Sequence, residues 1–376
     1  MIVAALLAWA AGLLMGAPSG APDRRRPEVW MVTYNPQWLT ARNQSWGFLQ
    51  RHLDGVGIYI NMVAFRTPAE ELAPFLRELR RRRIRVAVEC GYFDWEATRD
   101  DFSAPNPKGI SDKVRAAVRP GVGEETARTE MAKLKALIDA YGPPDVIALD
   151  GPIRRLLHPG ADTGRIAPHG EQEGLPSLDA AVEEVVATMR AWVRTHRRVR
   201  FAVITNFPNW GWKGGPAYWA SGPGLMHWGD YYPALRALAA RCKRERLPLE
   251  AIRCDFPFDY ANGTMPVSSP PWPKPAVDPA SIDWVGRIRD LEREVQALGL
   301  DFELVVNEQQ GGGASSERFC RETLRYVDAY RAAGGAPRRW IVQTWYPHPE
   351  KVGPEDEPWT MAWLTAEVIR RVRPVR

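Results

Sequence analysis

Apolar segments that end abruptly in a polar side chain recur along this chain, and they constrain its fold more than any other feature. The run at 145–150 ends in Asp150, and Gly151-Pro152 breaks it at once. A short apolar run bounded by turn residues is typical of a buried parallel strand. Further runs of this kind end at Asn206, at Asp255 and at Asn307-Glu308. We therefore expect these strand ends to lie side by side around one pocket.

Helical and extended patterns alternate along the chain with a period of roughly forty residues. The strands are expected at 28–34, 55–60, 84–88, 145–150, 199–205, 249–254, 302–306 and 339–343. Helical spacing follows most of them, as at 124–141, 177–197, 281–298 and 315–333. This alternation predicts an α/β fold, specifically a closed (β/α)8 TIM barrel.

The barrel is expected to occupy 27–376 as a single catalytic domain, with loop insertions near 96–121, 207–232 and 256–280. A chain of 376 residues, 45% of them hydrophobic, can bury a core of that size. An open doubly wound sheet is the alternative. It would require a glycine-rich phosphate loop after the first strand, and Thr33-Tyr-Asn-Pro36 is not such a loop.

The net charge of +5 does not by itself indicate a nucleic-acid partner. The 50 basic residues are nearly matched by 45 acidic ones. Much of the basic excess is arginine on presumed helices, as at 80–83. We interpret it as a solvated helical surface and expect no nucleic-acid binding.

The N-terminal segment 1–21 is apolar, carries no charge and ends in small residues. It predicts a cleaved signal peptide and a secreted or periplasmic protein. Arginines at 24–26 disfavour a permanent anchor, and no later run is long enough to span a bilayer, so we expect no membrane partner after cleavage. The four cysteines lack metal-ligand spacing; buried thiols are favoured over a disulfide, which export would permit. The oligomeric state is left open.

In a barrel of this type, the strand ends and the loops after them build the active site. Four acids are expected there: Glu89, Asp150, Asp255 and Glu308. Because side chains alternate along a strand, Arg253 shares a face with Asp255, and a buried arginine requires an anionic partner. The same strand ends supply Asn61, Asn206, Gln343 and Trp345. A structural role is the alternative for any one acid, but it is hard to sustain for all four.

Acids without accompanying metal ligands favour glycosidic cleavage, which needs only two carboxyl groups flanking the bond. None of the six histidines falls on a strand end, and His348 is the nearest. We therefore expect no metal and no other cofactor. Trp210 and Trp212, on the loop after the fifth strand, are expected to stack on sugar rings, with packing inside the loop as the alternative.

At this point the chain resembles the TIM-barrel glycoside hydrolases. Leu149-Asp150-Gly151 and Ile252-Arg-Cys-Asp-Phe256 are similar to the strand-four and strand-six aspartate contexts of the alpha-galactosidase clan. The resemblance implies that Asp150 is the nucleophile and Asp255 the acid/base of a retaining mechanism. The largest clan of these barrels instead places an Asn-Glu acid on strand four, whereas Asn307-Glu308 stands on strand seven here. No specific family follows from the resemblance.

The sequence thus predicts a secreted glycoside hydrolase that acts on an oligo- or polysaccharide. Glu308 is the alternative acid/base, and Glu89 with Arg253 is expected to tune the charge of the site. The residues expected to contact substrate are Glu89, Asn61, Asn206, Trp210, Trp212, Arg253, Gln343 and Trp345. Two other functions remain open: a carbohydrate-binding barrel without catalysis, and a metal-assisted hydrolase or deacetylase.

Overall fold

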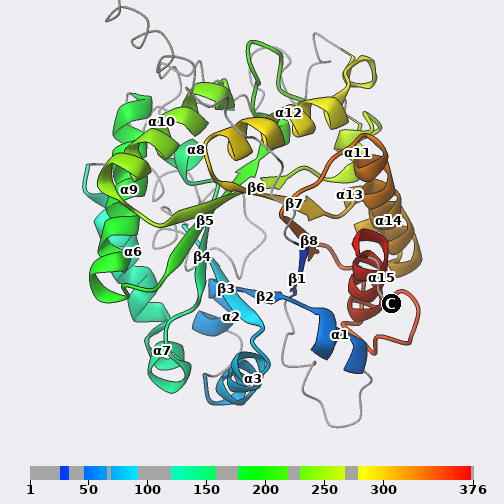
Figure 1. Ribbon diagram of the computed structural model, residues 1–376, viewed down its shortest axis with the longest axis horizontal. Coiled ribbons are helices and arrows are strands. Elements are labelled where there is room, and N and C mark those ends of the chain that lie inside the picture. Colours follow the sequence, from blue (N-terminus) through cyan, green and yellow to red (C-terminus); the bar gives the residue numbers. More distant parts are fainter. Residues whose placement is uncertain are drawn as a thin grey trace, which may run out of the picture.

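The computed structural model describes residues 26–33, 46–65, 69–91, 120–157, 177–218, 229–266 and 278–373. Eight parallel strands form a closed barrel in the order β1 to β8 (Figure 1). They are β1 Glu28–Val32, β2 Gly55–Tyr59, β3 Arg85–Cys90, β4 Val146–Asp150, β5 Arg200–Asn206, β6 Leu249–Asp255, β7 Asp301–Val306 and β8 Arg339–Gln343. β1 pairs with both β2 and β8, which closes the cylinder. The predicted (β/α)8 barrel is confirmed.

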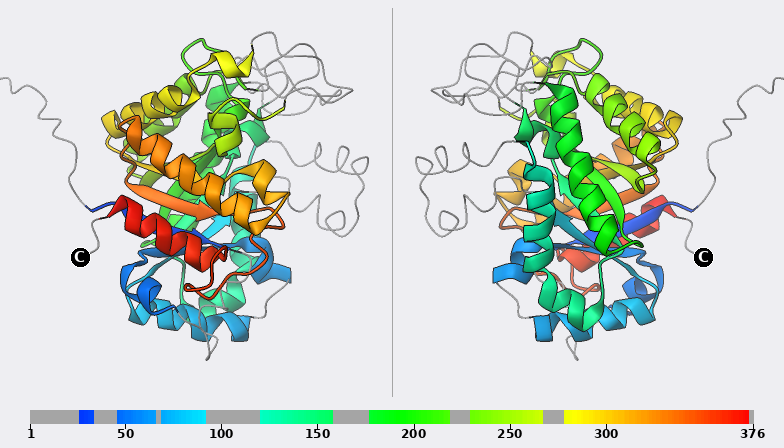
Figure 2. Two further views of the ribbon diagram at one scale, coloured as in Figure 1. Left: turned by 90° about the vertical axis from the view of Figure 1, so that its right-hand side faces the viewer. Right: turned by 90° about the vertical axis from the view of Figure 1, so that its left-hand side faces the viewer.

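Helices surround the barrel in every view (Figures 1 and 2). On the first half of the chain they are α1 Gly47–His52, α2 Ile60–Phe65, α3 Ala69–Arg81, α6 Val122–Lys133, α7 Lys135–Tyr141 and α8 Pro152–Leu156. On the second half they are α9 Leu178–Thr195, α10 Tyr231–Glu245, α11 Phe258–Ala261, α12 Trp284–Ala297, α13 Gln309–Gly312, α14 Ser316–Ala332 and α15 Met361–Val372. Two short 3-10 turns are η2 Phe207–Asn209 and η3 Pro279–Ser281. The helix expected at 124–141 is divided into α6 and α7 at Leu134.

Side-chain caps fix where several of the long helices begin. Ser177 accepts a hydrogen bond from the Ala180 amide at the start of α9, and Ser315 and Thr360 do the same for α14 and α15. Each cap satisfies one backbone N–H that has no partner inside its helix. The caps therefore set the helix starts close to where the sequence placed them.

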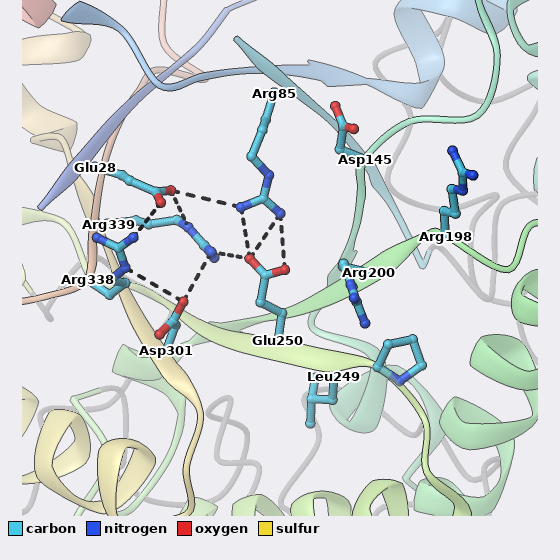
Figure 3. Close-up of a pocket in the computed structure, with 11 residues that line it drawn as sticks. Glu28, Arg85, Asp145, Arg198, Arg200, Leu249, Glu250, Asp301, Arg338 and Arg339 are labelled. Atoms are coloured by element: carbon cyan, nitrogen blue, oxygen red, sulfur yellow. Dashed lines mark hydrogen bonds and ion pairs between the residues drawn. The ribbon is translucent and has the colours of Figure 1, made fainter. Parts of the chain in front are cut away.

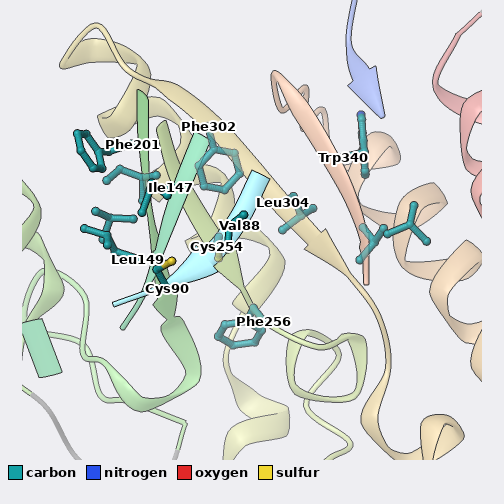
Figure 4. Packing of buried hydrophobic residues seen from close by; sticks show 14 of the residues in the cluster. Val88, Cys90, Ile147, Leu149, Phe201, Cys254, Phe256, Phe302, Leu304 and Trp340 are labelled. Atoms are coloured by element: carbon teal, nitrogen blue, oxygen red, sulfur yellow. The ribbon is translucent and has the colours of Figure 1, made fainter. Parts of the chain in front are cut away.

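Two separate apolar layers follow from the alternation of side chains along the strands. The outward layer includes Val88, Ile147, Leu149, Phe201 and Leu304, which pack beneath the surrounding helices (Figure 4). The inward layer fills the barrel itself. On its β3 to β6 side the inward residues include four alanines, Ala87, Ala148, Ala202 and Ala251, together with Val146 and Ile204. The alanine side chains leave room for larger ones that enter from other strands.

Some sequence predictions fall where the structure makes no statement. The expected signal peptide at 1–21 lies outside the described residues, as does nearly all of the insertion near 96–121. Among the described residues, no helix is long and apolar enough to cross a membrane. The four cysteines are buried and free.

Candidate active site

The carboxylates of Asp150 and Asp255 end strands that are separated by β5 alone. Asp150 lies beside Ile204 of β5, and Asp255 lies beside Asn206 of the same strand. Asn206 donates a hydrogen bond from Nδ2 to Oδ2 of Asp255 at 3.0 Å. Asp150 and Asp255 are only 8% and 7% exposed. The structure therefore brings together three of the residues that the sequence predicted for the site.

Asp150 forms ion pairs with two arginines of α8, the short helix that begins directly after the turn at Gly151. Gly151 adopts a left-handed conformation with φ of 50°, and Pro152 then begins α8. A side chain on Gly151 would collide with Arg154, so glycine is needed at this turn. Arg155 binds Oδ2 of Asp150 at 2.6 Å, and Arg154 lies 3.9 Å from the same oxygen. Asp150 is therefore an ion-paired carboxylate at the barrel mouth.

Asp255 is in a different electrostatic environment. Burial raises the pKa of its carboxyl to about 7, and the negative charge of Asp150 contributes to the rise. The hydrogen bond from Asn206 and the positive charges of Arg154 and Arg253 oppose it. A carboxyl group with a pKa near 7 can both give and accept a proton at neutral pH, which suits it to general acid/base chemistry.

Several buried polar atoms near the strand ends make no hydrogen bond within the described residues. They are Oδ1 of Asn61, Oδ1 of Asn206, Oδ1 of Asp255, both amide atoms of Asn307 and Oε1 of Gln343. A buried polar atom without a partner costs about 1 to 3 kcal/mol. Because these residues lie at or just after the carboxyl ends of β2, β5, β6, β7 and β8, the unpartnered atoms are consistent with a polar ligand or ordered water at the barrel mouth.

Asn307 was named in the sequence as part of a strand end but was not assigned to the site. It follows the inward residues Glu303 and Val305 at the same spacing of two, and it is fully buried. The sequence prediction assigned the adjacent Glu308 to the site as one of four acids. Strand alternation, counted from Val305, was the signal that could have identified Asn307.

A second group of predicted residues gathers where β2, β3 and β8 end. Gln343 donates from Nε2 to Glu89 and to the Tyr59 hydroxyl, each at 3.2 Å. The Tyr59 hydroxyl donates to the Thr344 carbonyl oxygen at 3.3 Å. The Trp345 ring lies 5.3 Å from the Tyr59 ring, is partly exposed, and packs against the inward layer. Trp345 is therefore the partly exposed ring of this pair, and Tyr59, which the sequence did not predict, is buried beneath it.

The structure corrects the roles expected for Trp210 and Trp212. They are 2% and 5% exposed and belong to the outward apolar core. Their rings pack on Tyr231 and Phe207, and Trp212 donates from Nε1 to Asp290 of α12 at 2.8 Å. Neither indole has a free face for a sugar ring, so the alternative that the sequence left open, packing, is the one observed.

Glu308 and Arg253 are also placed differently from the expectation. Glu308 caps α13 by accepting a hydrogen bond from the Gly311 amide. Burial raises the pKa of Glu308 to about 7, and its charged neighbours include Asp259 and Arg318. This capping role weakens its candidacy as the alternative acid/base.

Arg253 is 1% exposed, and it binds Glu303 of β7 at 2.6 Å. The prediction that Arg253 has an anionic partner is confirmed. The partner is Glu303 inside the barrel, so the structure does not support a direct contact between Arg253 and substrate.

Within the described residues, no group of three or more histidine, cysteine, aspartate or glutamate side chains is arranged to hold a metal ion. His348, the histidine nearest a strand end in the sequence, directs Nδ1 toward the Ser316 hydroxyl at 3.2 Å. The chemistry of the described mouth is therefore that of carboxyl, amide, guanidinium and phenol groups.

Comparison with known proteins places the chain at the level of its fold. No protein-family model matches the sequence, and no curated protein matches it. The endo-beta-1,4-mannanase from Thermotoga petrophila is similar in structure, with a TM-score of 0.51, 11% identity, and coverage of 92% of this chain and 77% of that chain. The family 53 glycoside hydrolase catalytic domain from Ignisphaera aggregans has a TM-score of 0.47 and 11% identity, covering 95% of this chain and 98% of that one. At 11% identity the similarity to the mannanase shows a shared TIM-barrel fold, and no specific family is indicated.

Proposed function

We propose that this protein is a glycoside hydrolase in which Asp150 is the nucleophile and Asp255 the acid/base. The supporting observation is the pair itself: two buried carboxyl groups at the ends of β4 and β6, one ion-paired and the other with a pKa raised to about 7. Two carboxyl groups in contrasting environments are the arrangement that glycosidic cleavage requires.

The mechanism uses the two groups in sequence. Protonated Asp255 gives its proton to the glycosidic oxygen while the Asp150 carboxylate attacks the anomeric carbon, so the bond to the leaving group breaks and a glycosyl-enzyme ester forms. The Asp255 carboxylate then takes a proton from water, which attacks the anomeric carbon and releases Asp150. The hydrogen bond from Asn206 orients Asp255 through both steps.

Other residues at the mouth supply substrate contacts in this proposal. Trp345, which is partly exposed and packs on the buried Tyr59, offers an aromatic surface for the apolar face of a sugar ring. The buried amides of Asn206, Asn307 and Gln343 carry atoms that have no hydrogen-bond partner within the described residues, and these atoms are assigned to sugar hydroxyls. The apolar segment 1–21 supports export of the enzyme to a secreted or periplasmic location.

The decisive experiment measures substrate turnover and then traps the glycosyl-enzyme ester. The purified protein is incubated with a panel of oligosaccharides and aryl glycosides, and a 2-deoxy-2-fluoro analogue of any cleaved sugar is then used to trap the ester. We expect release of product with retained anomeric configuration, and mass spectrometry should locate the trapped sugar on Asp150. Inversion of configuration, or a label on another residue, would contradict the assignment of Asp150.

A metal-assisted hydrolase is tested in the same assay by exhaustive chelation. We expect unchanged rates. Loss of turnover that a divalent ion restores would replace the two-carboxylate mechanism with the metal-assisted one.

A carbohydrate-binding barrel without catalysis is the second candidate, and the ion pair between Arg155 and Asp150 favours it. A guanidinium at 2.6 Å withdraws charge from the oxygen that must attack. Saccharide binding by calorimetry without turnover on any member of the panel would select this candidate over the hydrolase.

A further inference from the structure

A chain of ion pairs enters the barrel interior directly beneath Asp255. Arg253 stands two residues before Asp255 on β6, so the two side chains share the inward face. The Nε of Arg253 donates to Oε2 of Glu303 at 2.6 Å. These two side chains are 2% and 1% exposed, so the pair lies in the low-dielectric interior.

The other carboxylate oxygen of Glu303 extends this series of ion pairs toward the N-terminal ends of the strands. Its Oε1 accepts from Nη1 of Arg339 on β8 at 2.6 Å. Arg339 also binds Glu28 at 2.8 Å and Asp301 at 3.1 Å, and it pairs with Glu250.

The chain ends at the N-terminal ends of the strands. Three of the acids that bind Arg339, namely Glu28, Glu250 and Asp301, line a cavity of about 530 Å³ there together with Arg85 and Arg338, and Figure 3 shows their interactions. Acidic and basic groups thus alternate from Asp255 through Arg253, Glu303 and Arg339 to this cavity.

Stability alone does not account for this arrangement. Barrel interiors are usually filled by branched apolar side chains, and replacing a buried ion pair with apolar residues of similar volume is often neutral or stabilising. Here β4 and β5 carry the small inward residues Ala148 and Ala202, whereas β6, β7 and β8 carry the charged Arg253, Glu303 and Arg339 on the inward face. An ionic layer below an ionisable carboxyl group has an electrostatic effect that an apolar layer lacks.

We propose that Arg253 and Glu303 form a positioning pair that sets the electrostatic environment of Asp255 from inside the barrel. Arg253 brings a positive charge toward Asp255, and Glu303 offsets part of that charge. Burial raises the pKa of Glu303, but the charges of Arg253 and Arg339 outweigh burial and hold that pKa at about 2. Glu303 is therefore ionised at every pH at which Asp255 titrates. The consequence for catalysis rests on the proposed role of Asp255, but the electrostatic effect does not.

Other groups also interact electrostatically with Asp255 and are left in place by the test. They are Asp150 of β4, Arg154 of α8, Asn206 of β5, Cys254 of β6, Tyr326 of α14 and Tyr346 after β8. A change in the titration of Asp255 in variants of Arg253 and Glu303 therefore reports on the pair.

The test is a titration of Asp255 in the intact protein by NMR of ¹³C-carboxyl-labelled aspartate, with the signal assigned by its absence in Asp255→Asn. Arg253→Met removes a positive charge, so the midpoint is expected to rise by about one pH unit, the scale of one charge at this range. Glu303→Gln leaves Arg253 less compensated, so the midpoint is expected to fall by a similar amount. Arg253→Lys keeps the charge and should titrate close to the parent.

The opposite directions separate the proposal from a general loss of structure. Should Glu303→Gln fail to fold, Arg253→Met still decides the matter, because Glu303 keeps Arg339 as its partner in that variant. An unchanged or lowered midpoint in Arg253→Met overturns the proposal. Shifted midpoints without cleavage of any glycoside would refute only the hydrolase, whereas cleavage with unshifted midpoints would refute only the positioning pair.

Discussion

The two ends of this barrel differ in how completely Arg339 and Asp255, two buried ionisable residues, are paired. At the N-terminal ends of the strands, Arg339 binds Glu28, Asp301 and Glu303 at 2.6 to 3.1 Å. At the carboxyl ends, Asp255 has one oxygen that accepts no hydrogen bond from the described residues, and its pKa is raised to about 7. Arg339 at the N-terminal end is thus surrounded by acidic partners, whereas Asp255 at the carboxyl end has one buried oxygen without a partner among the described residues.

The difference supports the proposal that the functional site lies at the carboxyl ends of the strands. Compensating a buried charge stabilises the folded state relative to leaving it unpaired, whereas an unpartnered buried polar atom destabilises it. Residues such as Asn307 and Asp255 are retained at the mouth in spite of that cost. This agrees with the general division of TIM barrels, in which the carboxyl ends carry chemistry and the opposite end carries stability.

The largest effect is expected for Asp150→Asn, which keeps the shape of the side chain and removes its charge. If Asp150 is the nucleophile, turnover should fall by on the order of 10⁴-fold or more, as for removal of other catalytic nucleophiles. The matched control is Asp145→Asn at the opposite end of β4, where Asp145 accepts a hydrogen bond from the Val86 amide. Rates for both variants on one substrate check this, and equal rates would remove the functional distinction between the two ends.

Asp255→Asn is expected to lower turnover by about 10²- to 10⁴-fold, the usual contribution of a general acid. Substrates with activated aryl leaving groups should lose less, because they need little protonation. For the parent, a pKa near 7 predicts that activity declines as pH rises above about 7, since Asp255 then lacks its proton. A pH profile without that decline would contradict the acid role.

Asp255→Asn should also change how the free energy of unfolding depends on pH. The folded-state pKa of Asp255, about 7, exceeds its usual value of 3.8. The stability that this group contributes is therefore full below about pH 3.8 and is lost as pH rises to about 7. Denaturant unfolding across that range should show the parent losing stability relative to Asp255→Asn, by about 1.4 kcal/mol per pH unit at most. A constant difference between the two proteins would contradict the raised pKa.

At the other end, Arg339→Met should lower the free energy of unfolding by about 3 to 5 kcal/mol, because it leaves several buried acids without their shared cation. Arg338→Met is the matched control. Arg338 binds Glu28 at 2.7 Å, but its side chain is 17% exposed against 3% for Arg339. A loss of about 1 kcal/mol or less is expected for this more exposed pair. Equal losses in urea unfolding would mean that burial does not govern these pairs.

The smallest expected effect on saccharide binding is that of the aromatic cluster outside the barrel. Trp212→Phe keeps a ring but loses the hydrogen bond to Asp290, so a loss of about 1 to 2 kcal/mol is expected, against about 3 to 5 kcal/mol for Trp212→Ala. Saccharide affinity should be unchanged in both, whereas Trp345→Ala should weaken it by roughly tenfold or less. Weaker saccharide binding in a stably folded Trp212 variant would show that Trp212 contributes to the binding site after all.

Local periodicity was enough to predict the strands. The run at 339–343 coincides with β8, and the runs at 249–254 and 302–306 differ from β6 and β7 by one residue. Alternation then placed Arg253 and Asp255 on one face, as observed. These predictions succeeded because a two-residue period and a strand end are properties of a short segment and depend little on the rest of the chain.

What the sequence determined by itself is therefore the barrel and the identity of most groups that reach its mouth. Only the tertiary structure decided their partners: Glu303 for Arg253, Arg155 for Asp150 and Asp290 for Trp212. Two of these partners lie on other strands or helices, and the third depends on the turn at Gly151. Closure of the barrel sets which side chains share a level, and that long-range geometry separates a buried tryptophan such as Trp212 from one at the pocket such as Trp345.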